Sequence, residues 1–231
     1  MFREPPPKTH SEKRPLSTPT SHADLDELVA RKQARAIDER ALRTLFHDAR
    51  TANGFLPRPV PRALLERIVD IAKLGPTSAN SQPMRLVFVE SAAAKERVRP
   101  ALSPGNLDKT MAAPVTAIVA ADLHFYEHLP RMFPHAPQMK AVFEGPEKAE
   151  LAGSTARLNA TLQGAYFMLV ARGLGLDVGP MAGFDRAKVD AEFFPGGTVV
   201  SLWLCNLGYG DDTKVLGRNP RFAFDEIATV V

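Results

Sequence analysis

Three short apolar runs, separated by helical patterns, constrain the fold of this chain more than any other feature. They cover residues 86–89, 115–121 and 199–207, and apolar runs of this length between turn residues are typical of buried strands. Because the run at 115–121 is apolar on both of its faces, we expect it at the centre of a sheet. Strands and helices mixed in this way indicate an α/β or α+β fold, in which helices flank a sheet.

Cap and breaker residues bound the helices that we expect around these strands. The longest is expected from about residue 147 to residue 172, with Leu158, Leu162 and Tyr166 on one apolar stripe and Gly173 as its stop. Shorter helices are expected at 38–46, at 61–75, directly after Ser91 and at 185–194. Residues 103–106 are expected to form a turn, and the proline-rich segment 130–146 an irregular loop of the kind that often covers a site.

The length of 231 residues favours one folded domain with an appendage. Residues 1–21 are rich in Pro, Ser, Thr and Lys and nearly free of large apolar side chains, so we expect them to be disordered. Residues 22–35 have helical character but are strongly charged. We therefore expect an N-terminal extension over residues 1–36, disordered or partly helical, and a folded domain over residues 37–231.

The overall composition excludes several classes of protein. The net charge of +3 is small, so neither nucleic acid nor an acidic membrane surface is indicated as a partner. No stretch approaches the roughly 20 apolar residues of a membrane span, and the N-terminus lacks the apolar core of a secretory signal. Cys205 is the single cysteine and lies in an apolar run, which predicts a buried, inert thiol. We expect a cytoplasmic protein.

Several familiar motifs are absent or lie in the wrong context. Gly173, Gly175 and Gly179 resemble a dinucleotide fingerprint, but they close a helix instead of opening one after a strand. His124 and His128 have the spacing of metal ligands on a helix but no third ligand beside them, so we expect surface histidines and no metal site. The nucleophile elbow of hydrolases and the Walker loop of nucleotide-binding enzymes are also missing.

The segment 75–83 holds the most suggestive chemistry. A helix stops at Gly75 and Pro76, and small polar residues follow, among them Ser78, Asn80 and Gln82. Their donors and acceptors are concentrated in a small space. Local chemistry alone leaves two readings open: an ordinary loop between a helix and a strand, or a surface that holds a flat ligand rich in heteroatoms.

Further polar residues lie at expected loop positions. They are Arg50, Thr51 and Asn53 after the first helix, Asn106 and Lys109 at the turn before the central strand, residues 180–183, and Arg218 and Arg221 in the C-terminal tail. Taken singly, each is an ordinary cap, turn residue or solvated charge.

Taken together, these segments resemble the FMN-dependent nitroreductase superfamily over the region from about Asp38 to Val231. The stretch 75–83 is similar to that family's proline-serine-x-x-asparagine-x-glutamine-proline element. Residues 180–185 are similar to its proline-x-x-glycine-phenylalanine-aspartate loop, and residues 106–109 to its asparagine-x-x-lysine pair. Residues 221–226 resemble its closing element, with Ala223 in place of a proline.

The resemblance implies a fold, an assembly and a cofactor. The fold would be α+β and nitroreductase-like, with a central mixed, mostly antiparallel sheet flanked by helices. The assembly would be a homodimer with two FMN molecules at its interface, and the C-terminal tail would extend onto the partner. NADH or NADPH would supply electrons.

The resemblance also implies which residues hold FMN. Arg221 and Arg50, and then Arg218, would bind the phosphate. Lys109 would lie beside N1 and O2 of the flavin, and the backbone N–H of Gly183 would face N5. No side chain is marked as a catalytic acid or base. The full implied set is Arg50, Thr51, Asn53, Pro76, Ser78, Asn80, Gln82, Asn106, Lys109, Pro180, Ala182, Gly183, Arg218 and Arg221.

Within the superfamily, the chain most resembles the malonic semialdehyde reductases of the Rut uracil-degradation pathway, on segments that include residues 41–53, 113–120 and 179–186. This resemblance implies ping-pong hydride transfer from NAD(P)H to malonic semialdehyde, with Arg131 as a candidate partner for the substrate carboxylate. A broad nitro or quinone reductase on the same scaffold and a flavin-binding protein without turnover are the alternatives.

Overall fold

The computed structural model describes residues 22–231, and the disorder expected for residues 1–21 lies outside this range. The chain divides into two compact units, one ending at Glu39 and one running from Arg40 to Val231. In the first, α1 (His22–Gln33) is a charged helix without a buried residue, as its composition predicts. The proposed division into an extension of residues 1–36 and a domain of residues 37–231 stays a prediction.

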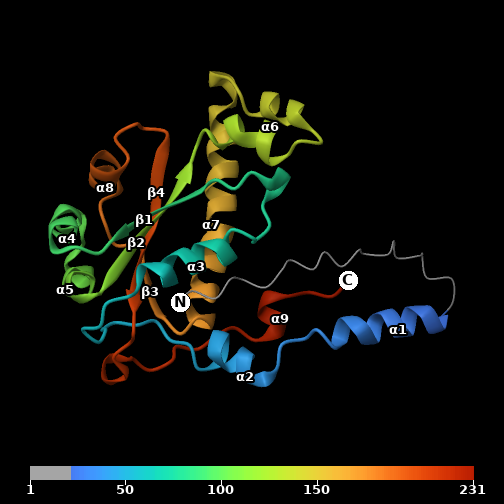
Figure 1. Cartoon of the computed structure of the whole chain (residues 1–231), viewed down its shortest axis with the longest axis horizontal. Helices are drawn as coiled ribbons and strands as arrows, with labels where there is room; N and C mark the ends of the chain where they lie inside the picture. The colour runs from blue at the N-terminus through green and yellow to red at the C-terminus, as the bar shows by residue number, and fades with distance from the viewer. Residues whose placement is uncertain (1–21) are drawn as a thin grey trace, which may run out of the picture. The chain divides into compact units, whose positions relative to one another are not determined.

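The second unit is built around a four-stranded sheet (Figure 1). The strands β1 (Met84–Val89), β2 (Val115–Asp122), β4 (Val199–Gly208) and β3 (Asp177–Met181) lie side by side in that order, and each pairing is antiparallel. The interior strand β2 is buried along its whole length. The three strands expected from apolar runs are therefore confirmed, and so is the central place of β2.

Two features of the sheet differ from expectation. The prediction of a mixed sheet was wrong for these four strands, and the parallel pairing found in the described part of the chain is an isolated bridge between Thr51 and Val178. The strand β3 was not predicted, because its Gly179 and Pro180 are typical of turns. Pro180 is tolerated because β3 lies at the edge of the four-stranded sheet, where β4 is its neighbouring strand and the bridge to Thr51 involves Val178 and not Pro180.

Helices cover both faces of the sheet (Figure 1). On one face, α3 (Arg62–Ala72) and α7 (Ala149–Gly173) pack a core in which Ile68 and Phe167 are fully buried. On the other face, α4 (Ala92–Val98), α5 (Pro104–Ala112) and α8 (Arg186–Phe193) lie over the core residues Ile118 and Leu204. Adjacent β2 residues point to opposite faces, so Ala117 and Ile118 belong to different cores.

Short helices complete the unit. They are α2 (Glu39–Leu42) with the π-helical turn Arg43–His47, α6 (Leu129–Met132), α9 (Phe224–Ile227), and 3₁₀ turns at Ser78–Asn80, Arg99–Ala101, Phe125–His128, Pro137–Val142, Pro146–Lys148 and Asp212–Lys214. The segment 130–146 is thus a series of helical turns, more ordered than expected. The described residues contain no helix long and apolar enough to cross a membrane.

The helix α7 buries mainly small residues, together with Phe167, and exposes several of its leucines. Ala156, Ala160 and Gly164 face the core, and a Cβ on Gly164 would lie 2.5 Å from the Trp203 ring, so glycine allows close packing on the sheet. The predicted stripe instead faces outward, with Leu158 64% and Leu162 46% exposed. The apolar period is therefore right, but this stripe does not pack on the core of the same chain.

Two predicted boundaries need correction. The helix α7 includes Gly173, and the glycine with the left-handed backbone is Gly175, at φ +84°. The segment 103–106 is not a free turn, because Ser103 is the N-cap of α5 and Pro104 opens that helix. Pro is well suited to the first helical position, where its missing N–H costs nothing.

The side chains of Cys205, His124 and His128 behave as expected. Cys205 is fully buried, and burial raises the pKa of its thiol to about 12. Both histidines are exposed. An inert thiol and surface histidines are therefore confirmed.

Lys95 is an exception to the apolar core. It is only 3% exposed, and its ammonium donates to the Thr110 carbonyl at 2.8 Å and to Thr116 Oγ1 at 2.5 Å. Burial lowers the pKa of Lys95 from its usual 10.5 to about 8, because the charged form loses its hydration.

This shift makes the free energy of unfolding depend on pH. Between about pH 8 and pH 10.5 the native protein releases the Lys95 proton while the unfolded chain still holds it, so stability rises with pH, by about 3 kcal/mol at most. Urea unfolding at about pH 7.5 and 9.5 measures this rise, with Lys95→Met as the reference that lacks it. Parallel profiles for the two proteins would contradict the prediction.

Candidate functional site

A cavity of about 480 Å³ lies between the segment after α2, the end of α7 and the C-terminal tail. It brings together five of the residues marked in the sequence, namely Arg50, Thr51, Asn53, Arg218 and Arg221. The other residues that line it are Phe46, Ala49, Arg172, Leu216, Gly217 and Asn219. Segments more than 160 positions apart in the chain thus meet here, as expected for the two halves of a phosphate site.

Backbone contacts hold the walls of this cavity in place. The Ala52 N–H donates to the Val178 carbonyl at 3.0 Å, which fixes the segment 51–53 along β3. A Cβ on Gly179 would lie 2.5 Å from the Ala52 oxygen, so only glycine allows this approach. Arg218 donates to the carbonyls of His47 and Ala49, and Arg50 donates to that of Leu216, so that each segment fastens the other.

The cavity is strongly basic. Of the residues that the structure describes, four arginines and no carboxylate line it. Guanidinium groups match the geometry of phosphate oxygens and form charge-assisted hydrogen bonds with them. The donor set therefore fits a phosphate dianion.

Arg172 is the member of this set that the sequence did not mark. Its Nη1 donates to the Leu45 carbonyl at 3.2 Å, while its Nε is buried and has no hydrogen-bond partner within residues 22–231. Burial is the main cause that lowers the pKa of its guanidinium, and neighbouring Arg218 acts in the same direction. A bound anion would accept a hydrogen bond from the Arg172 Nε, and its negative charge would stabilise the charged form of the guanidinium. In the sequence, a basic residue in the last turn of a helix carries no special signal, because it complements the helix dipole.

A second group of marked residues lies where β3 meets α8. Asn106 Nδ2 donates to the Gly183 carbonyl at 2.8 Å, and the Ser103 N–H donates to the same oxygen at 3.1 Å. A Cβ on Gly183 would lie 2.6 Å from Asn106 Nδ2, so glycine permits this contact. Pro180 and Ala182 belong to the same stretch.

Lys109 follows Asn106 by one turn of α5. It is partly exposed, and its ammonium forms no hydrogen bond or ion pair with residues 22–231. The group adjoins the arginine cavity through β3, because Thr51 bridges Val178 two residues before Pro180.

The third group, around 76–82, is a strained turn. Ala79, Asn80 and Gln82 have φ values of +50°, +48° and +43°, a conformation that costs free energy in residues other than glycine and occurs where surrounding contacts enforce it.

Hydrogen bonds at 2.7–2.8 Å enforce this conformation. They join the Ser78 N–H to Asn159 Oδ1, Asn80 Nδ2 to the Met132 carbonyl, and Gln82 Nε2 to Asn80 Oδ1. Arg85 also donates to the Gln82 carbonyl at 3.0 Å. Ser78, Asn80 and Pro76 remain exposed.

Within one chain, the turn at 76–82 does not lie beside the arginine cavity. Ser78 is held by Asn159, whereas the arginine cavity lies at Arg172. These two residues are thirteen positions apart on α7, or about 20 Å along the helix axis. The residues marked in the sequence therefore fall into two separate places.

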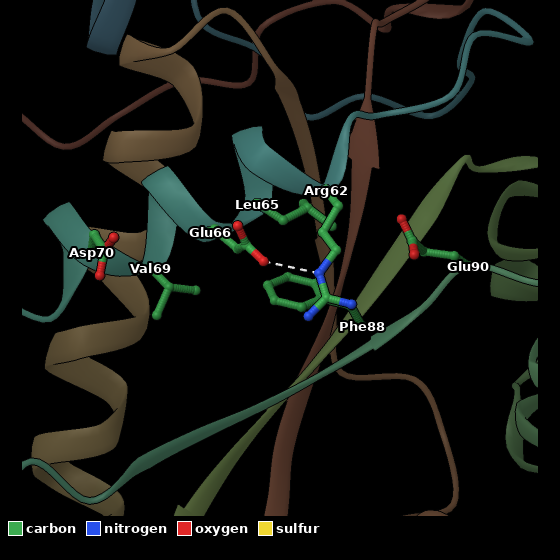
Figure 2. Close-up of a pocket in the computed structure, with 7 residues that line it drawn as sticks. All are labelled: Arg62, Leu65, Glu66, Val69, Asp70, Phe88 and Glu90. Carbon is green, nitrogen blue, oxygen red and sulfur yellow. Dashed lines mark hydrogen bonds and ion pairs between the residues drawn. The ribbon is translucent and has the colours of Figure 1, made fainter. Parts of the chain in front are cut away.

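A larger cavity, of about 620 Å³, holds none of the marked residues. It lies between α3 and the edge strand β1, as Figure 2 shows. Arg62 and Glu66 form an ion pair at 2.9 Å across its rim, and Asp70 and Glu90 add negative charge. This excess of carboxylates does not fit a phosphate.

Comparison with known proteins identifies the family to which the chain is related. Residues 48–201 match the model of the Nitroreductase family. The protein named "Putative NADH dehydrogenase/NAD(P)H nitroreductase HadB" of Ralstonia pickettii is 53% identical over 190 residues, which are 82% of this chain and 97% of that protein. A relative from Burkholderia lata with the same description is 55% identical over 194 residues, 84% of this chain and 98% of its own.

Solved structures agree on the fold. A nitroreductase structure from Bacillus subtilis superposes with a TM-score of 0.76 at 20% identity, over 84% of this chain and all of its own. A nitroreductase structure from Exiguobacterium sibiricum, solved in complex with FMN, has a TM-score of 0.74 at 19% identity, over 85% of this chain and 98% of its own. The α+β nitroreductase-like fold is thereby confirmed, and the chain belongs to the nitroreductase family.

Proposed function

We propose that this protein is an FMN-dependent NAD(P)H oxidoreductase that reduces malonic semialdehyde (3-oxopropanoate) to 3-hydroxypropanoate. The observation that carries the proposal is the cavity with four arginines and no carboxylate, reached by segments from both ends of the domain. FMN bears a phosphate dianion that this donor set fits. The names of the relatives, which include NADH and NAD(P)H, support the choice of reductant.

Each group of residues has a part in holding FMN. Arg50, Arg172 and Arg221 bind its phosphate, and the segment 180–183 lies along the edge of its ring system. Gly183 brings backbone close to that ring because it has no side chain. Lys109 contributes a positive charge that favours the reduced, anionic state. When bound, FMN carries the two electrons between the nicotinamide and the acceptor.

The overall reaction balances without a catalytic side chain. NAD(P)H gives up a hydride and becomes NAD(P)⁺, and the aldehyde carbon of 3-oxopropanoate gains that hydride while its oxygen takes a proton from water. The two substrates occupy the same face of the site in turn, a ping-pong sequence. The setting is uracil degradation in the cytoplasm, which the single buried thiol of Cys205 suits.

A second reaction, with a different electron acceptor, is the alternative to the reduction of 3-oxopropanoate. The word nitroreductase in the names of the relatives favours reduction of nitro compounds on the same scaffold. Arg131 on α6 distinguishes the reduction of 3-oxopropanoate from that of nitro compounds. Its side chain is exposed and has no hydrogen-bond or ion-pair partner in residues 22–231. A free guanidinium beside the turn at 76–82 favours an acceptor with a carboxylate.

Arg131→Ala is accordingly expected to raise KM for 3-oxopropanoate about tenfold and to leave the KM for a neutral nitroarene unchanged. Steady-state rates with both acceptors, at saturating NADPH, measure this difference. An equal effect on the two acceptors would remove the role of Arg131, and faster turnover of the nitroarene than of 3-oxopropanoate would favour the nitroreductase.

The working unit is a homodimer. Four observations support this assembly. The turn at 76–82 lies about 20 Å from the arginine cavity of its own chain, so it serves a cavity on the partner. The α7 stripe of Leu158, Leu162 and Tyr166 is exposed. So are the tail residues Phe222 and Phe224. The strand β1 pairs with β2 alone among the described residues, which leaves an edge for an extended tail of the partner.

Leu158→Asp tests this assembly. A carboxylate in the centre of an apolar interface is costly, so the variant is expected to run as a monomer of 25.2 kDa where the wild type runs at twice that mass. Leu56→Asp is the matched control, because Leu56 is also exposed but lies off the stripe. Light scattering after gel filtration measures the masses, and a wild-type monomer that binds FMN fully would contradict the proposal.

A further inference from the structure

The buried ammonium of Lys95 has no part in the site described so far. Its side chain reaches from α4 across the sheet face and donates to the Thr110 carbonyl and to Thr116 Oγ1. Within residues 22–231 no carboxylate pairs with it. An unpaired charge in the core is rare in proteins, because the ammonium loses its hydration without gaining an opposite charge.

The position of the Thr110 carbonyl explains why a donor is needed there. Thr110 lies in the last turn of α5, where carbonyls lack a partner from the next turn. The residue four positions later is Pro114, which has no N–H to donate. Lys95 supplies that hydrogen bond, and its charge also opposes the negative end of the α5 dipole.

A hydrogen-bond network connects Lys95 and the end of α5 to the elements around the site. Thr116 Oγ1 donates to Asn206 Oδ1 at 2.7 Å, and Asn206 Nδ2 donates to Thr110 Oγ1 at 3.4 Å. Thr110 Oγ1 in turn contacts Met181 Sδ at 3.4 Å. The network thus joins α4, α5, β2, β4 and the end of β3, next to Lys109 on one side and the loop with Gly183 on the other.

We propose that Lys95 is a positioning residue of the cofactor site: it fixes the last turn of α5 and so holds the Lys109 side chain in place for the flavin. The inference rests on the proposed binding of FMN. A position that only filled the core would be satisfied by an apolar side chain, which carries no desolvation cost. The charge is retained because α5 is short, is followed by Pro114 two residues after its last residue, and carries both Asn106 and Lys109.

A double-mutant cycle between Lys95→Met and Lys109→Ala tests the inference, with the FMN dissociation constant and the reduction potential of bound FMN as readouts. Lys95→Met is expected to weaken FMN binding about tenfold in the wild-type background but less than about threefold in the Lys109→Ala background. It should shift the potential in the same direction as Lys109→Ala. Lys73→Met, which removes an exposed lysine at the C-cap of α3, should change neither quantity.

The unfolding of the FMN-free protein separates positioning from a merely structural role. At pH 7 the Lys95→Met apoprotein is expected to have a free energy of unfolding close to that of the wild type, because the cost of burying a charge disappears while the Thr110 carbonyl loses its donor, and these two changes oppose each other. Thr116→Val is the second variant, since it keeps the volume and the lysine but removes one acceptor; its expected effect on FMN binding is about threefold.

Each outcome is decisive. Wild-type affinity for FMN in Lys95→Met, or an equal loss in both backgrounds, would overturn the inference while the proposed function stands. If Lys95→Met does not fold, wild-type affinity in Thr116→Val overturns it in the same way, and a loss in Thr116→Val that vanishes in the Lys109→Ala background supports it. A wild-type protein that binds no FMN overturns the proposed function and this inference with it.

Discussion

Arg50→Met is expected to weaken FMN binding about 100-fold. Hydrogen bonds to charged groups contribute about 1.5–3 kcal/mol each, and Arg50 supplies both a charge to the cavity and a bond to the Leu216 carbonyl that holds the tail. Its loss therefore removes a phosphate partner and loosens the opposite wall. Titration of the FMN-free protein, followed by flavin fluorescence, measures the change.

Arg67→Met is the matched control for this variant. Arg67 is an exposed arginine on α3, away from the cavity, so its replacement removes the same charge from the protein without touching the site. We expect wild-type affinity. A dissociation constant for Arg50→Met within about threefold of the control value would show that the cavity does not bind the phosphate.

Gly179→Ala is expected to destabilise the fold by about 2–3 kcal/mol and to weaken FMN binding as well. The new Cβ would lie 2.5 Å from the Ala52 oxygen. The oxygen belongs to the backbone and the position of the Cβ is fixed by the backbone, so no side-chain rotation relieves the clash. The segment 51–53 must separate from β3, which breaks the bond from the Ala52 N–H to the Val178 carbonyl. Urea unfolding measures the first effect and FMN titration the second.

Gly196→Ala provides the comparison. A Cβ on Gly196 meets nothing within 4 Å, and its backbone is not left-handed, so the unfolding free energy should stay within about 0.5 kcal/mol of the wild type. Equal stability of Gly179→Ala and Gly196→Ala would contradict the close approach of the two segments.

The sequence predicts three strands of the sheet and misses the fourth. The runs that became β1, β2 and β4 are mostly apolar, and this leaves a clear pattern even for β1, which lies at an edge of the sheet. The strand β3 lies at the other edge and has no such run, because an edge position tolerates Gly179 and Pro180. Local residue preferences therefore indicate a turn where pairing with β4 makes a strand.

The helix α7 shows a different limit. Periodicity finds its apolar stripe but cannot tell which surface the stripe meets. The side toward the sheet is mostly Ala and Gly, which let the helix lie close to the sheet, and Leu158 and Leu162 face outward. The same apolar pattern is consistent with a core or with an interface between chains.

The site residues divide in the same manner. The segments 50–53 and 218–221 meet in one cavity, as their chemistry suggested. Arg172 was missed because its position at a helix end is ordinary in sequence, and only the packing of Arg218 and the tail around it makes it unusual. The distance between the turn at 76–82 and this cavity follows from the tertiary placement of α7, which no local pattern contains.

The affinity of the FMN-free protein for FMN, compared with riboflavin, tests the central claim most directly. The two ligands share the ring system and differ in the phosphate, which the arginine cavity is proposed to hold. We predict one FMN bound per chain and a riboflavin affinity at least about 100-fold lower, because the charge-assisted bonds to the phosphate are lost. A protein that binds neither ligand, or binds both equally well, would contradict the account.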